Sequence, residues 1–149
     1  MKLLRYGPKG AEKPGLLDDN SEIRDLSSII NDLTGDTVDP DTLARLSALD
    51  TATLPVVEGT PRIGPCIGSV GKLVCIGLNY SDHAKETGSP IPTEPIVFMK
   101  ATSSINGPND DIELMRGSEK TDWEVELGFV ICKETKYVDE TEALDHVAG

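Results

Sequence analysis

Short apolar stretches separated by turn-forming residues open the chain. Lys2–Tyr6 and Gly15–Leu17 are strand candidates, and the turn-forming run at residues 18–20 is assigned as the turn between them, which predicts a small hairpin. The run DPDTLARLSALD at residues 39–50 begins with a capping aspartate and a first-turn proline, and its leucines recur at helical intervals. This pattern predicts a short amphipathic helix.

Stronger strand patterns follow after a stretch rich in Thr, Pro and Gly. Residues 51–70 resemble an extended connector, and apolar runs bounded by Gly, Pro or Asp then predict strands at Lys72–Gly77, Ile96–Lys100 and Trp123–Cys132. Between the first two strands, Asn79–Lys85 has the composition of a short helix capped by its asparagine.

The end of the chain carries a capping-box pattern that begins at Asp139, which predicts the start of a helix. With the change in pattern after the connector, we expect two domains, a small one over residues 1–68 and a second over residues 69–149. The elements predict an α+β fold in which the second domain is mainly β.

Composition restricts the partners of the chain. Its 149 residues include 14 Lys and Arg against 26 Asp and Glu, a net charge of −12, without any basic cluster. Nucleic-acid binding depends on phosphate neutralisation, so we expect no nucleic-acid partner and expect a cation as the more natural ligand.

The cysteines indicate the cellular setting. Three cysteines without CxxC spacing favour neither a disulfide framework nor a cysteine zinc site, which fits a reducing, cytoplasmic setting. No apolar stretch is long enough to cross a bilayer, so no membrane partner is expected.

Alternating carboxylates mark the run DWEVEL. In a strand, Asp122, Glu124 and Glu126 point to the same face, and like charges in a row favour neutralisation by a cation. Oxygen ligands suit Mg²⁺, Mn²⁺ and Ca²⁺. The alternative is a solvent-facing edge strand whose acidic side chains are only hydrated.

A second group of polar residues directly follows the strand at 72–77. On a helix, His83 and Glu86 lie one turn apart, where the carboxylate can orient the imidazole as a general base; an exposed histidine with an incidental glutamate is the alternative. Tyr80 lines the site or caps the turn. Lys100 closes its strand and either receives a substrate carboxylate or reaches solvent. His146 lies in no motif and is interpreted as structural.

Taken in order, these segments resemble the fumarylacetoacetate hydrolase family, in particular its shorter members. The resemblance covers about residues 70–149 and rests on four blocks, VCIGLNYSDHAKE, EPIVFMK with ATSSI, DWEVELGFVI and DETEALDHVAG. It implies a mixed β-roll catalytic domain, incomplete here and preceded by a small α+β accessory domain, that works with Mg²⁺ or Mn²⁺ and a small oxo-acid substrate, usually as a homodimer.

Carried over by position, the resemblance implies that Glu124 and Glu126 are metal ligands and that His83 and Glu86 activate water or move a proton. Lys100 matches a lysine that follows a strand in the family. We predict Lys100 and Tyr80 as substrate-binding residues. The third ligand of the family, an aspartate, is expected beyond Gly149. We therefore expect these residues to be the N-terminal half of a protein of nearly twice this length, with little activity when isolated.

The implied reaction is hydrolytic cleavage of a C–C bond in a 2,4-diketo acid, such as an acylpyruvate or a sugar-derived diketo acid. Isomerisation, decarboxylation and ureidoglycolate lyase chemistry in the same family stay open, because fold and metal do not choose among them. A non-catalytic acidic domain that binds a cation and a degenerate family member are the further alternatives.

Overall fold

The chain folds into two compact units in the computed structural model, which describes residues 1–149. Residues 1–69 and 106–149 form the first unit, and residues 70–105 form the second. The expected division into domains at residues 1–68 and 69–149 stays a prediction, because compactness alone does not show which segment folds independently.

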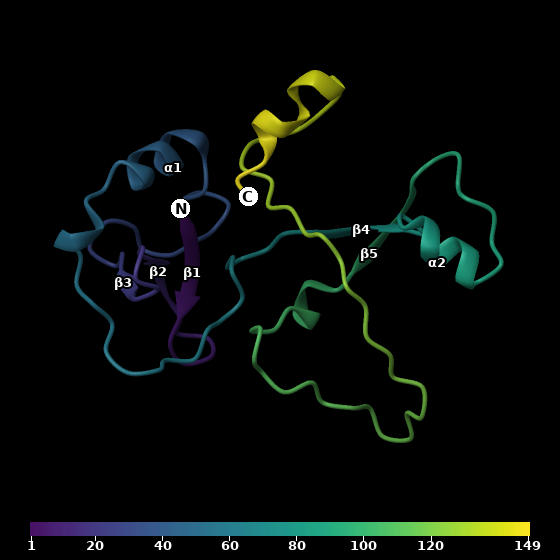
Figure 1. Ribbon diagram of the computed structural model, residues 1–149, viewed down its shortest axis with the longest axis horizontal. Coiled ribbons are helices and arrows are strands. Elements are labelled where there is room, and N and C mark those ends of the chain that lie inside the picture. The colour runs from purple at the N-terminus through teal and green to yellow at the C-terminus, as the bar shows by residue number, and fades with distance from the viewer. The chain divides into compact units, whose positions relative to one another are not determined.

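A three-stranded antiparallel sheet forms the centre of the first unit (Figure 1). Its strands are β1 (Lys2–Tyr6), β2 (Lys13–Leu17) and β3 (Ile23–Asp25), paired in that order. The β1–β2 hairpin confirms the prediction. The turn at residues 18–20 belongs instead between β2 and β3, where Asp18 Oδ1 accepts hydrogen bonds from two backbone amides, both at 2.9 Å. The third strand was not predicted, because its sequence IRD is short and mostly charged.

Helix α1 (Pro40–Ser47) begins where the capping pattern predicts. Asp39 Oδ1 accepts hydrogen bonds from the backbone amides of Asp41 and Thr42, each at 3.0 Å, so the carboxylate satisfies amides that the first helical turn leaves free. The core of the first unit is an apolar cluster shared by the sheet, the helix and the intervening loops: Leu16, Leu26, Ile30, Leu33, Val38, Leu46 and Leu54.

The segment at residues 51–70 is packed, which corrects its interpretation as an extended connector. A 3₁₀ turn, η1 (Thr51–Thr53), opens the segment. Single β-bridges then join Val56 to β3 and Ile63 to β1, and Ile67 packs against the core. The prolines remove amide donors, so this chain pairs with the sheet at single positions and not along a ladder.

An antiparallel ribbon and one short helix make up the second unit. The ribbon pairs β4 (Leu73–Gly77) with β5 (Ile96–Lys100), two strands that the sequence predicts without indicating their pairing, and α2 (Ser81–Glu86) follows β4. Figure 1 places α2 beyond one end of the ribbon. The predicted cap at Asn79 is wrong, because Tyr80 occupies the capping position and its side chain makes no capping hydrogen bond.

The predicted strand at Trp123–Cys132 is wrong. This stretch forms only one β-bridge, between Ile131 and Val147, and otherwise runs without a ladder. An alternating pattern needs a neighbouring strand to accept its backbone hydrogen bonds, and Trp123 and Leu127 keep 80% and 72% of their surface exposed.

The helix predicted from Asp139 is present as a 3₁₀ helix. After η2 (Thr102–Ser104), a further 3₁₀ helix, η3 (Glu140–His146), closes the chain, and Asp139 precedes it without a side-chain capping bond. Short strands and few helical residues make this a mixed α+β fold, as the sequence predicts.

Candidate functional site

Helix α2 carries the histidine and glutamate that the sequence singles out. His83 and Glu86 lie one turn apart, so both face the same side of the helix, and both side chains are exposed. Ala84 between them is fully buried. The imidazole and the carboxylate form no hydrogen bond with each other. The predicted spacing is therefore present, while the orienting contact is not made.

The turn that leads from β4 into α2 contains a strained residue. Leu78 has a φ of 49°, in the left-handed region that bulky side chains rarely adopt. Such strain persists only where the surrounding structure holds it, and it gathers at functional sites. No sequence pattern predicts this backbone conformation, because leucine is not a residue associated with it. Tyr80 follows two residues later and is 44% exposed.

Lys100 lies at the opposite end of the ribbon from α2. The register pairs Lys100 with Leu73, the first residue of β4, whereas Ile96 pairs with Gly77 at the end that leads to α2. The steps from Ile96 to Lys100 span about 13 Å at roughly 3.3 Å per residue. The structure therefore places Tyr80, His83 and Glu86 on α2 and the turn before it, at one end of the ribbon, and Lys100 at the other end.

Glu124 and Glu126 belong to the other compact unit, within the stretch of residues 111–129 that has no regular secondary structure. Both residues are exposed. The predicted strand face of three carboxylates is wrong, because no strand forms there. Nowhere in residues 1–149 do three or more His, Cys, Asp or Glu side chains gather closely enough to hold a metal ion.

The donor chemistry of these two glutamates nevertheless fits a hard cation. Carboxylate oxygens are the ligands that Mg²⁺ and Mn²⁺ prefer, and Mg²⁺ is commonly held by one or two carboxylates with water and substrate. A pair of exposed carboxylates is thus a partial ligand set. The assignment of both residues as ligands stays a prediction.

None of the helices has the length and apolar composition that crossing a bilayer requires.

Curated bacterial proteins are similar to this chain over its whole length. Proteins named "Putative hydrolase" from Burkholderia ambifaria and Burkholderia multivorans are 63% and 64% identical to this chain over 149 residues, which is 100% of this chain and 53% of each relative. The chain thus spans about half the length of the curated relatives it matches.

A solved structure shows the same fold. The fumarylacetoacetate hydrolase (EaFAH) from the psychrophile Exiguobacterium antarcticum aligns with a TM-score of 0.75 at 26% identity, over 99% of this chain and 52% of that protein. The family model described as "Fumarylacetoacetate (FAA) hydrolase C-terminal" matches residues 72–149. Because this match covers more than half of the residues, the chain belongs to the fumarylacetoacetate hydrolase family.

Proposed function

We propose that this chain supplies catalytic residues of a metal-dependent hydrolase that cleaves a C–C bond in a small 2,4-diketo acid, an acylpyruvate or a sugar-derived diketo acid. The observation that carries the proposal is the family match over residues 72–149, a stretch that contains all six candidate site residues. The relatives from Burkholderia, whose names read "Putative hydrolase", support the hydrolytic class.

Glu124 and Glu126 would hold Mg²⁺ or Mn²⁺, with Ca²⁺ as a weaker candidate, together with a third carboxylate from outside residues 1–149. When bound, the ion supplies Lewis-acid polarisation of the substrate's 2-oxo group. The two glutamates supply negative charge that draws the ion to the loop at residues 111–129.

His83 is proposed to take a proton from the water that attacks the distal carbonyl, and Glu86 to orient the imidazole once substrate is bound. Catalytic hydrogen bonds are often long in free enzymes and tighten in the substrate complex, so the missing contact between the two side chains is compatible with this role. The C–C bond then breaks, its electron pair stays with the pyruvate-type fragment, and that fragment takes up a proton. The products are one carboxylic acid and one 2-oxo acid.

Tyr80 and Lys100 are proposed to bind the substrate, with Lys100 as the cation for a carboxylate. Lys100 lies about 13 Å along the ribbon from the end that leads to α2. Tyr80 and Lys100 would therefore contact different parts of the substrate, or act at different stages of the reaction.

The test uses the intact gene product that contains these residues, whatever its length. Its mass, its divalent metal content and its turnover of acetylpyruvate would be measured on one sample, with and without EDTA and with Mn²⁺ added back. We expect about one Mg²⁺ or Mn²⁺ per chain and release of acetate and pyruvate that EDTA abolishes and Mn²⁺ restores. Metal-independent turnover would contradict the metal site, and turnover of oxaloacetate but not acetylpyruvate would contradict the substrate class.

A further inference from the structure

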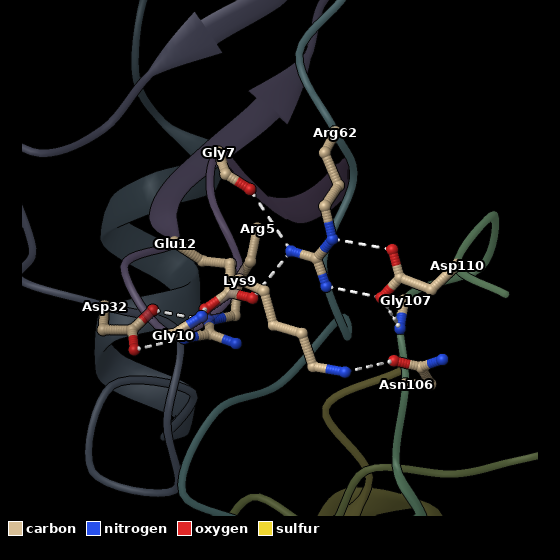
Figure 2. Close-up of polar contacts among 10 residues, drawn as sticks. All are labelled: Arg5, Gly7, Lys9, Gly10, Glu12, Asp32, Arg62, Asn106, Gly107 and Asp110. Carbon is tan, nitrogen blue, oxygen red and sulfur yellow. Dashed lines mark hydrogen bonds and ion pairs between the residues drawn. The ribbon is translucent and has the colours of Figure 1, made fainter. Parts of the chain in front are cut away.

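Five side chains of alternating charge form a continuous ladder in the first unit (Figure 2). Arg5 donates two hydrogen bonds to Asp32, at 2.7 and 2.9 Å, and lies 3.6 Å from Glu12. Glu12 in turn accepts from Arg62 at 2.8 Å, and Arg62 donates to both oxygens of Asp110, at 2.7 and 2.6 Å. Each guanidinium therefore contacts two carboxylates. Arg5 binds Asp32, and Arg62 binds Asp110, in a bidentate geometry that combines strength with fixed orientation.

Partial burial strengthens this ladder. The side chains of Arg5 and Glu12 are 10% and 6% exposed, and those of Arg62 and Asp110 are 24% and 15% exposed. The hydrogen bonds from Arg62 lower the pKa of Asp110 to about 2, and the same guanidinium lowers the pKa of Glu12. These groups satisfy one another, so the ladder serves as a fastening and not as a binding site for a ligand.

The ladder ends on the turn at residues 106–110, which two further contacts hold. Lys9 Nζ donates to Asn106 Oδ1 at 3.2 Å. Gly107 donates its amide to Asp110 Oδ2 at 2.9 Å and lies so close to the carbonyl oxygen of Ile63 that a Cβ would come within 2.5 Å of it. Residues 1–69 thus fix this turn by charge, by hydrogen bonding and by close packing.

The first unit also holds the end of the loop at residues 111–129 in place. Val130 and Ala148 pack against the apolar core of the first unit. They are joined by backbone hydrogen bonds, from the Ala148 amide to the Val130 carbonyl and from the Val130 amide to the Gly149 carbonyl, both at 2.8 Å. The loop at residues 111–129 is therefore anchored at its start and at its end on residues 1–69.

We propose that residues 1–69 are a positioning scaffold for the loop at residues 111–129, with Arg62 as the residue that fastens the start of the loop. Anchoring both ends reduces the conformations that the loop can adopt, so the entropy lost when its side chains converge on a ligand is smaller. The inference deepens the proposed function, because Glu124 and Glu126 lie on this loop, and it makes the N-terminal region a part of the site's architecture instead of a separable accessory domain.

The test compares Arg62→Gln and Arg62→Lys with a control, Arg45→Gln, at an exposed arginine of α1. Amide hydrogen exchange is measured by NMR at Gly107 and Asp110, which report the first anchor, and at Val130 and Ala148, which report the second. Binding of Mn²⁺ alone is followed by paramagnetic broadening of the Glu124 and Glu126 amides.

We expect Arg62→Gln to speed exchange at Gly107 and Asp110 by about tenfold or more, since hydrogen bonds to charged groups contribute strongly. Exchange at Val130 and Ala148 should stay unchanged, and the Mn²⁺ Kd should rise severalfold. Arg62→Lys, which keeps the charge but loses the fork, should lie between the wild type and Arg62→Gln.

Unchanged exchange at Gly107, or faster exchange with an unchanged Mn²⁺ Kd, would overturn the positioning role. A wild-type chain that binds no Mn²⁺ would contradict the proposed metal function, and the exchange rates at Gly107 and Asp110 would then decide on the anchor by themselves.

Discussion

Gly107 packs against Ile63 so tightly that no side chain fits between them, since a Cβ at residue 107 would lie 2.5 Å from the Ile63 carbonyl oxygen. Replacing Gly107 by alanine should therefore lower the free energy of unfolding by about 1–3 kcal/mol, the usual range for overpacking a close contact. Urea unfolding followed by circular dichroism measures the change.

Gly128 provides the matched control for this substitution. It lies in the same unit, and a Cβ there meets no atom within 4 Å. Gly128→Ala should leave stability unchanged or raise it slightly. Equal effects of the two substitutions would mean that residue 107 is not packed as described.

The pair of Arg62 and Asp110 predicts an acid-dependent loss of stability. The pKa of Asp110 lies at about 2 in the folded chain, below its ordinary value of 3.8. A lowered carboxyl pKa contributes stability that is complete above about pH 4 and is lost as the pH falls towards 2. Asp110→Asn should therefore reduce the loss of stability over this interval. Urea midpoints between pH 2 and pH 6 measure it, and Asp111→Asn, at an exposed neighbour, should behave as the wild type.

Metal binding should depend on Glu126. If this carboxylate is a ligand, Glu126→Gln should remove most of the affinity of the intact protein for Mg²⁺ or Mn²⁺, because a neutral amide is a weaker ligand for a hard cation. Calorimetric titration measures the affinity. Glu134→Gln, at an exposed glutamate of the same unit, serves as the control and should bind the metal normally. Equal affinities for both variants would reject Glu126 as a ligand.

Turnover should depend on His83. The His83→Ala variant of the intact protein should show a kcat lower by about two to four decades, the usual contribution of a general base, while its metal affinity stays near normal. Steady-state kinetics and calorimetry on one preparation separate the two effects. His146→Ala replaces the other of the two histidines and should retain most activity. A loss of only a few-fold in His83→Ala would make His83 a structural residue.

Local sequence patterns were sufficient to predict some of the secondary-structure elements. Strands β1, β2, β4 and β5 follow from short-range periodicity, and the helix that Asp39 caps follows from its capping pattern. Short-range signals also placed His83 and Glu86 one turn apart on α2. Each of these features depends on residues that are close in the sequence. A strand of this kind can be predicted from its own apolar pattern, without knowledge of the strand that pairs with it.

Long-range contacts were not predictable from the same patterns. The ladder joins residues that lie 27, 50 and 48 positions apart, and none of its members stands in a local motif. The alternation at Trp123–Cys132 wrongly predicted a strand, because alternation describes a side-chain pattern and cannot supply the neighbouring backbone. The packing of residues 51–70 was not predicted, because isolated β-bridges impose no regular alternation of apolar and polar residues on the sequence.

Exposed apolar side chains flank the two glutamates of the loop at residues 111–129. Trp123, Val125 and Leu127 are 80%, 75% and 72% exposed, and Glu124 and Glu126 stand between them. Charges interleaved in an apolar row act as gatekeepers against intermolecular β-pairing. The same carboxylates that are proposed to bind the cation are therefore expected to oppose association between molecules, and a chain with both of them neutralised should self-associate at lower concentrations than the wild type.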